Sequence, residues 1–312
     1  MLVVRLAESL KLRKQPSSAA AFVPAHISGF FQPCEASTPE RTGSRNCGPC
    51  LNFGVRTEVN VESSDRNRVE VFINGKPAPE AKTTLTVAEQ ILSQVEETFR
   101  LRVDHFCEVP VGAGYGASGA GALGTAFSLA KALGLRLSRR QLVTAAHVAE
   151  VRCCTGLGDV GAQAHGGLVI GLEPGAPPYG RWKGIRVPRE VKIICATLGP
   201  IPSKKLLSEA DFRRRAGEVG TLAFKKMMER PDVYNFITAS KEFAENLGLF
   251  DDELKELARA AERSGAIGAS QVMIGRAVFA IACGESIARV QRTFLEMLDA
   301  ESLLVADIYR GG

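Results

Sequence analysis

Residues 109–124 read VPVGAGYGASGAGALG and contain six glycines but no charged side chain. Glycine loses more conformational freedom on folding than any other residue, so this density indicates backbone with unusual angles or a close approach. The stretch follows the end of a predicted strand, HFCEVP (105–110), and from Ser118 onward apolar residues recur at helical spacing. A loop that enters a helix N-terminus presents free N–H groups and the positive end of the helix dipole. The stretch therefore predicts an anion site suited to phosphate.

Other interpretations of the glycines are weaker, and one stays open. The pattern G-x-G-x-x-G occurs twice, but the dinucleotide fingerprint also needs an acid about 20 residues further on, and residues 137–143 contain none. No lysine follows the glycines before Lys131, which excludes a P-loop. The uncharged run over 109–130 is mostly Gly and Ala, unlike a membrane span. A close-packed helix whose glycines only admit neighbours remains the alternative to an anion site.

The whole chain has the composition of an ordinary globular protein. It has 312 residues, of which 45% are hydrophobic and 23% charged, enough for one large or two ordinary domains. The net charge of +5 is mild and the basic clusters have no aromatic interleaving, so we expect no nucleic-acid partner. Several of the eight cysteines lie in apolar runs and no secretory signal is evident, which predicts a reducing cytoplasm and no membrane partner.

One cysteine pair offers a different chemistry. Cys47-Gly-Pro-Cys50 has the spacing of a dithiol redox motif, which thioredoxin-like proteins place at a helix N-terminus. Here the motif runs into LNFGVRTEVNV, which alternates like a strand. A dithiol oxidoreductase is therefore a minor alternative, as is a metal site that combines this pair with Cys34.

Periodicity predicts strands and helices in two successive groups. Strands are expected at 20–23, 51–61, 68–73, 102–109, 168–172, 191–198, 271–282 and 302–309. Helices are expected at 87–100, 118–133, 139–152, 207–229, 231–247, 251–263 and 285–300, and a polar loop at 24–49. Thr86 with Glu89 predicts a capping box, Ser138 a second helix cap, and Asn74-Gly75 a hairpin turn.

These elements fall into three regions of the chain. Residues 1–19 are basic and predict a flexible N-terminal arm. Residues 20–188 would form an N-terminal domain that contains the glycine loop, and residues 189–312 a C-terminal domain. The boundary lies just before VKIICATL (191–198), a continuous apolar strand. Clusters of strands and helices in two halves indicate an α+β architecture.

The glycine stretch resembles the phosphate loop of the GHMP kinases, whose usual form is P-x-G-x-G-L-G-S-S-A. Tyr115 replaces the usual Leu, and Ala117 replaces the first Ser and so removes one hydroxyl. The resemblance implies that the phosphates of ATP lie against Pro110, Gly112, Gly114, Gly116, Ala117, Ser118 and Gly119.

Three further segments fit the same family, and specifically its archaeal pantoate kinase branch. AFVPAHISGFF (21–31) with TGSRNCG (42–48) is similar to the substrate motif of that branch, with Ala25 in place of the usual Gly. TGLGDVGAQAHGG (155–167) resembles its catalytic-acid segment, and GASQVMIGRAVFA (268–280) its third motif. The resemblance implies a two-domain GHMP kinase fold. Its N-terminal half would resemble ribosomal protein S5 domain 2, and its C-terminal half would be ferredoxin-like.

Kinase chemistry needs a held triphosphate, a neutralising Mg²⁺ ion and an alcohol in line for transfer. Mg²⁺ prefers hard oxygen ligands, so Ser118 at the helix start and Glu150 in the next helix are the candidates. Asp159 is a lone acid among small and apolar residues. The resemblance makes it the base that accepts the hydroxyl proton.

The acceptor that the resemblance implies is pantoate, which would become 4-phosphopantoate in archaeal coenzyme A biosynthesis. An Arg fork is the best partner for a carboxylate, and Arg45 in a Ser/Gly-rich stretch is the candidate. His26 and Ser28 would bind the carboxylate or a hydroxyl, and Arg276 would add positive charge near the phosphoryl group. The alternatives are another acceptor, such as mevalonate or homoserine, and a non-catalytic nucleotide-binding regulator. The resemblance also makes a homodimer plausible.

Overall fold

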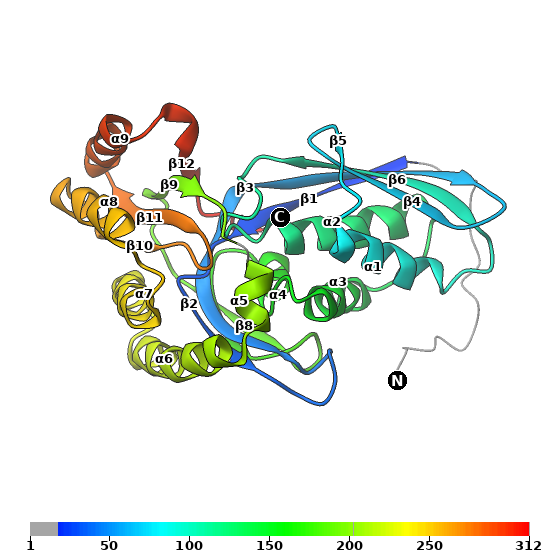
Figure 1. Ribbon diagram of the computed structural model, residues 1–312, viewed down its shortest axis with the longest axis horizontal. Coiled ribbons are helices and arrows are strands. Elements are labelled where there is room, and N and C mark those ends of the chain that lie inside the picture. The colour runs from blue at the N-terminus through cyan, green and yellow to red at the C-terminus, as the bar shows by residue number, and fades with distance from the viewer. Residues whose placement is uncertain (1–17, 202, 312) are drawn as a thin grey trace.

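The computed structural model describes residues 18–201 and 203–311, without the side chains of residues 203–205. It consists of a larger sheet covered by helices on one face and a smaller sheet with helices of its own (Figure 1). The predicted arm over 1–19 lies outside the described residues except for Ser18 and Ala19. These two residues already belong to the first strand.

The larger sheet is organised around one long strand, β3 (Gly43–Ser63). One half of β3 pairs with β2 and β7, and the other half pairs with β1 and β6. The other strands are β1 (Ser18–His26), β2 (Phe30–Cys34), β4 (Arg68–Ile73), β5 (Lys76–Pro77), β6 (Phe99–Cys107), β7 (Leu168–Glu173) and β8 (Arg181–Ile185). In β3, Val55, Thr57 and Val59 are buried while Arg56 is exposed, as the alternating sequence predicts.

Helices α1 (Lys82–Leu92), α2 (Ala117–Ala132) and α3 (Arg139–Cys153) cover this sheet, and α4 (Asp159–His165) follows them. The central helix α2 lies unusually close to the strands. A Cβ atom at Gly124 would lie 2.4 Å from Thr57 Oγ1, and one at Gly121 would lie 3.3 Å from the His105 ring. The close-packing interpretation therefore holds for the later glycines of the stretch, which let helix and sheet approach.

The smaller sheet has the strand order β10-β11-β9-β12, and all neighbours are antiparallel. Its strands are β9 (Val191–Gly199), β10 (Gly268–Gln271), β11 (Arg276–Cys283) and β12 (Leu303–Asp307). Its helices are α5 (Ser203–Ser208), α6 (Ala210–Glu229), α7 (Val233–Leu247), α8 (Asp252–Arg263) and α9 (Ser286–Met297), with a short 3-10 helix at Ala300–Ser302. Strands and helices alternate as β-α-β-β-α-β, which is the ferredoxin-like arrangement that the resemblance implied.

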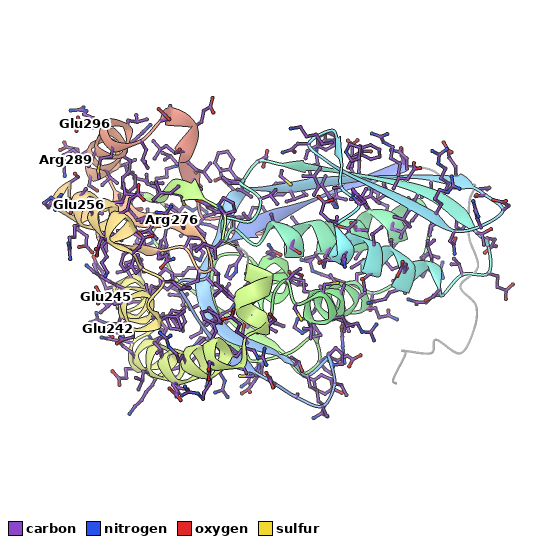
Figure 2. All side chains as sticks on the ribbon, in the orientation of Figure 1. Glu242, Glu245, Glu256, Arg276, Arg289 and Glu296 are labelled. Atoms are coloured by element: carbon purple, nitrogen blue, oxygen red, sulfur yellow. The ribbon has the colours of Figure 1, made fainter. Side chains whose placement is uncertain are left out.

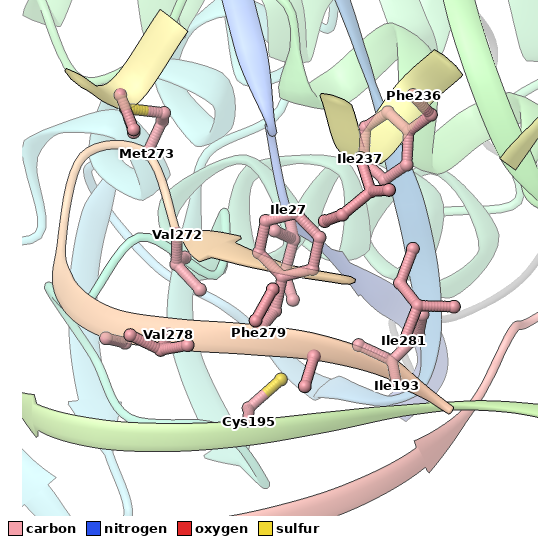
Figure 3. Close-up of a cluster of buried hydrophobic side chains, with 14 of the residues drawn as sticks. Ile27, Ile193, Cys195, Phe236, Ile237, Val272, Met273, Val278, Phe279 and Ile281 are labelled. Carbon is pink, nitrogen blue, oxygen red and sulfur yellow. The ribbon is translucent and has the colours of Figure 1, made fainter. Parts of the chain in front are cut away.

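One part of the larger sheet shares a hydrophobic core with the smaller sheet, and the other part forms a second core with α1, α2 and α3. Ile27, which follows β1, lies beside Phe279 on β11 and Val272 in the loop after β10 (Figure 3). The rings of Phe236 on α7 and Phe279 on β11 are stacked with centroids 5.8 Å apart. The larger sheet ends at residue 185 and the smaller begins at residue 191. A division into two domains near residue 188 stays a prediction.

Several predicted elements are wrong in extent. Residues 24–49 contain β2 and the start of β3 rather than one loop. The sequence does not reveal these strands because Gly, Pro and Ser residues interrupt the pattern of the buried side chains. The helix expected at 87–100 is α1 at 82–92, so Thr86 does not cap it. The apolar face of α1 ends at Leu92, and the alternation of buried and exposed side chains in β6 begins at Phe99.

Other expectations are confirmed. Ser138 caps α3, and its side chain forms a reciprocal capping box with Gln141. Asn74 and Gly75 both have positive φ angles in the turn between β4 and β5, as a hairpin turn of this sequence requires. Two other expectations are wrong in extent: the helix expected at 207–229 is broken between α5 and α6, and of the strand expected at 271–282 only Gln271 belongs to β10 while the rest starts at Arg276 in β11. No helix in the described part of the chain has the length and apolarity needed to cross a membrane.

Candidate active site

The early glycines of the stretch form a tight loop before α2. Gly112, Gly114 and Gly116 have φ angles of +80°, +90° and +65°, a region that other residues rarely adopt. Gly116 is the N-cap of α2, and no side chain caps this helix end. The first N–H groups of α2 are therefore available to an anion, as the sequence predicted.

This loop is held from the C-terminal half. A Cβ atom at Gly275 would lie 2.0 Å from the carbonyl oxygen of Ala113, so the connection between β10 and β11 runs directly against the loop. The Ile201 N–H donates to the carbonyl of Gly112 at 3.1 Å. The Tyr115 hydroxyl is 2.7 Å from Thr197 Oγ1 on β9. The two halves thus build one wall together.

A cleft with an empty volume of about 710 Å³ opens beside this wall. The glycine loop, the start of α2 and the connection between β10 and β11 line the cleft together with residues of β2, β3 and the segment that leads into α4. Its lining residues are Ser28, Phe31, Ser44, Asn46, Gly112, Gly114, Tyr115, Gly116, Ala117, Ser118, Glu150, Thr155, Gly156, Leu157, Gly158, Asp159, Leu207, Met273 and Ile274. Pro110 and Gly119, two of the expected phosphate contacts, do not line it. Pro110 is exposed beyond the loop, and Gly119 is buried against Glu150.

Asp159 begins α4, and its side chain is 23% exposed at the cleft. The Nδ1 atom of His26 lies 2.7 Å from Asp159 Oδ1, and the His26 side chain is fully buried. The sequence placed His26 as a ligand of the acceptor. That assignment is wrong in this geometry, because His26 lies behind Asp159 and does not line the cleft. Ser28 does line it, and its carbonyl accepts a hydrogen bond from the N–H of Met273.

Glu150 lies at the base of the cleft and is 1% exposed. Neither carboxylate oxygen has a hydrogen-bond partner within the described part of the chain. Burial and then the nearby charge of Asp159 raise the pKa of Glu150 well above its usual value. A Cβ atom at Gly119 or at Gly156 would lie within 3.1 Å of its oxygens. A buried, unpaired carboxylate facing a phosphate site is a strong candidate to bind a cation.

Ser118 is exposed in the first turn of α2, and its hydroxyl donates to Thr83 Oγ1 at 3.2 Å. Thr83 in turn lies 3.0 Å from Thr155 Oγ1. The described residues contain no cluster of three or more His, Cys, Asp or Glu side chains placed to hold a metal. Ser118 and Glu150, the two residues that the sequence predicts as Mg²⁺ ligands, both line the cleft.

Arg45 does not reach the cleft. Side chains alternate along β3, so Ser44 and Asn46 face the cleft while Arg45 faces the other side. Its Nε donates to the carbonyl of Leu172 at 3.2 Å, and its guanidinium lies over the ring of Phe224. The assignment of Arg45 to the substrate carboxylate is therefore wrong in this geometry.

Arg276 also lies elsewhere, at the edge of the C-terminal helices, as Figure 2 shows. It forms ion pairs with Asp251 and Glu253 at the start of α8. The expectation that it adds charge near the phosphoryl group is wrong for this geometry.

The cysteine pair has a structural role. Cys47 and Cys50 are buried on β3 in two different hydrophobic clusters, and both thiols are free. Burial raises the pKa of each thiol, which disfavours the reactive thiolate. Among the residues described, Cys34 has no role in a metal cluster. Neither the redox nor the metal alternative is supported.

Sequence reasoning missed the side chains that β2, β3 and the C-terminal half contribute to the cleft. Ser44 and Asn46 are two residues apart, and the alternation of a strand would have placed them together on one face. Phe31, Met273 and Ile274 add apolar side chains to the lining of the cleft. Only the tertiary fold brings these side chains to the cleft.

Comparison with known proteins defines the class to which this fold and cleft belong. A model of the GHMP kinases N-terminal domain matches residues 82–167, which contain the glycine loop, Glu150 and Asp159. A homoserine kinase from Cytophaga hutchinsonii superposes with a TM-score of 0.72 at 15% identity, over 97% of this chain and 98% of that one. A solved "phosphotransferase related to CoA biosynthesis pathway" superposes with a TM-score of 0.83 at 29% identity, over 94% and 97%. The chain is a GHMP kinase by fold.

Sequence comparison then narrows the class. The pantoate kinase of Thermococcus kodakarensis is 30% identical over 89% of this chain and 92% of its own length. The pantoate kinase of Methanocaldococcus jannaschii is 32% identical over 85% and 93%. The chain belongs to the pantoate kinase family.

Proposed function

We propose that this protein transfers the γ-phosphoryl group of ATP to the 4-hydroxyl of pantoate, forming 4-phosphopantoate and ADP. One observation carries the proposal: the partly exposed carboxylate of Asp159 lines the same cleft as the glycine loop, Ser28 and Asn46. The hydroxyl oxygen forms a bond to the γ-phosphorus while the bond from that phosphorus to the bridging oxygen of ADP breaks. The hydroxyl proton passes to Asp159.

The nucleotide phosphates bind along the uncapped start of α2. Backbone N–H groups at the turn from Gly116 to Ser118 are the donors, and the helix dipole favours the negative charge. Glu150 and Ser118 would hold a Mg²⁺ ion next to the phosphates. When bound, the ion neutralises charge on the phosphates. The buried carboxylate of Glu150 fits this role because it has no other partner among the described residues.

The acceptor end of the cleft matches the mixed chemistry of pantoate. Ser28, Ser44 and Asn46 supply neutral hydrogen-bond donors for its carboxylate and second hydroxyl. Asn46 Oδ1 is buried and has no partner in the described part of the chain. Phe31 and Met273 form apolar surface for the two methyl groups. A linear acceptor such as homoserine would leave that surface uncovered, which costs affinity.

The proposed acceptor also indicates the pathway to which the reaction belongs. The product is an intermediate of coenzyme A biosynthesis, in line with the solved phosphotransferase whose name refers to that pathway. The same proposal includes a cytoplasmic location, which cell fractionation would test. It also includes a homodimer, which sedimentation would test.

The test is ADP release by the purified protein with Mg²⁺-ATP and one acceptor at a time. Pantoate should support turnover, whereas pantothenate, mevalonate and homoserine should not. Asp159→Asn should lower kcat by about 10²–10⁴ while ATP still binds. The matched variant Asp211→Asn, at a side chain that is 94% exposed, should behave as wild type. Turnover with another alcohol only would refute the acceptor, and ATP binding without any turnover would favour a regulatory protein.

A further inference from the structure

His26 is the side chain at this site whose geometry the sequence explained least. It ends β1, is fully buried and contacts Asp159 through Nδ1 at 2.7 Å. It is not among the residues that line the cleft, so its side chain does not face the space where ATP and the acceptor would bind. Any role in the proposed reaction must therefore pass through Asp159.

The hydrogen-bond pattern defines which ring nitrogen carries the hydrogen. An ionised carboxylate can only accept, so Nδ1 must donate to Asp159 Oδ1. Nε2 of His26 is buried and has no partner in the described part of the chain. A second proton there would place a charged donor in buried surroundings without an acceptor, which is costly. The geometry therefore favours the neutral ring with its hydrogen on Nδ1.

The position of the ring is fixed from several sides. The backbone N–H of His26 donates to the carbonyl of Tyr115 at 3.0 Å, so the residue is tied to the glycine loop. Gln163 on α4 donates from Nε2 to the carbonyl of Gly116 at 2.8 Å, which ties the helix of Asp159 to the same loop. On the other side, a Cβ atom at Gly48 would lie 3.2 Å from His26 Nε2. The ring has little freedom to move.

We propose that His26 is a positioning residue that fixes one oxygen of Asp159 and so presents the other to the acceptor hydroxyl. The torsion that turns an aspartate carboxylate is soft, so a single fixed oxygen removes much of its freedom. Proton transfer needs the base within hydrogen-bond reach in a narrow geometry. This inference rests on the proposed function, because it assigns His26 to the same phosphoryl transfer.

Two amide substitutions test whether His26 acts by donating a hydrogen bond to Asp159 or only by filling space. In His26→Asn the amide nitrogen can occupy the place of Nδ1 and keep the donor to Asp159. In His26→Gln the amide reaches the place of Nε2 and leaves Asp159 without its donor. We expect His26→Asn to retain kcat within about threefold, and His26→Gln to lose about 10²-fold in kcat. KM for ATP and for pantoate should change by less than about threefold in both variants.

A spectroscopic measurement keeps the inference testable apart from activity. With isotope-labelled histidine, the His26 signals can be assigned among the four histidines of the chain from their loss in His26→Asn. We expect the hydrogen on Nδ1 in wild type, and a large change in that signal in Asp159→Asn. A wild type that turns over no acceptor would refute the proposed function, and the spectrum alone would then decide the role of His26.

Three results would overturn the inference. A hydrogen on Nε2 instead of Nδ1 would contradict the assigned geometry. Equal kcat values for His26→Asn and His26→Gln would show that a donor in the place of Nδ1 does not matter for the reaction. A rise in KM for pantoate with unchanged kcat would make His26 a ligand of the acceptor.

Discussion

Replacing Glu150 by Gln should stabilise the free protein and abolish its response to Mg²⁺. Glu150→Gln keeps the size of the side chain but removes a charge that is 1% exposed and lacks a partner in the described part of the chain. Burial and the charge of Asp159 both raise the pKa of Glu150. The folded protein therefore holds this proton at pH values where the unfolded chain has lost it.

The sign and size of the effect follow from that difference. A raised carboxyl pKa contributes stability in full below the unfolded value near 4.5, and the contribution is lost as pH rises through the folded pKa. Each pH unit between the unfolded and the folded pKa costs about 1.4 kcal/mol, so the cost grows as pH rises from 4.5. Gln does not titrate. The variant should therefore be more stable than wild type at pH 7, and about equal to it near pH 4.5.

The assay is thermal unfolding of both proteins between pH 4.5 and 8, with and without Mg²⁺ and a non-hydrolysable ATP analogue. A change of 1 kcal/mol moves Tm by about 2–4 °C for domains of this size class, so the difference is measurable. The matched control is Glu245→Gln, at an exposed position on α7 (Figure 2). It should show no such pH dependence.

The ligand experiment gives the second half of the prediction. Wild type should gain Tm with Mg²⁺ and the analogue together, because a bound cation compensates the buried carboxylate. Glu150→Gln should gain from the analogue but show little further gain from Mg²⁺. A variant that is less stable than wild type at every pH would refute the reasoning, since it would mean that Glu150 already has a stabilising partner.

Three further outcomes are expected. Burial lowers the pKa of His105 to about 4, so wild type should lose about 3 kcal/mol of stability as pH falls from 6.5 to 4; urea unfolding should show this loss in His165→Gln but not in His105→Gln. Gly275→Ala would force its Cβ into the glycine loop, so KM for ATP should rise at least about tenfold, whereas Gly217→Ala, with open space around its Cβ, should leave it unchanged. Arg45→Ala should change KM for pantoate by less than about threefold, because its guanidinium lies away from the cleft, and steady-state kinetics would expose a larger role.

Local sequence signals predicted the conformation of the glycine loop and of the helix that follows it. The glycines at 112, 114 and 116 do take the positive φ angles that their residue type permits, and the cap at Ser138 has its expected geometry. These features depend on interactions between residues a few positions apart. The helix that follows the loop was accordingly predicted to within one residue at each end.

The acceptor side could not be predicted in the same way. Arg45 had the right chemistry, but whether it faces the cleft depends on strand register, and the stretch that contains it was interpreted as a loop. The sequence predicts that His26 contacts the acceptor, but its side chain contacts Asp159, which is 133 positions away. Contacts of that separation are set by the fold as a whole rather than by local pattern.

The contact between Gly275 and the glycine loop bears on how this molecule could be divided. The nucleotide loop belongs to the first half of the chain, but one of its walls comes from a connection more than 150 residues later. A fragment that stopped before β9 would retain the phosphate-binding sequence and lack the surface that shapes it. The two halves are therefore not separable modules: sequence drift at 272–275 must be accommodated at 112–116, and chimaeras that exchange one half should bind ATP poorly unless both loops come from the same parent.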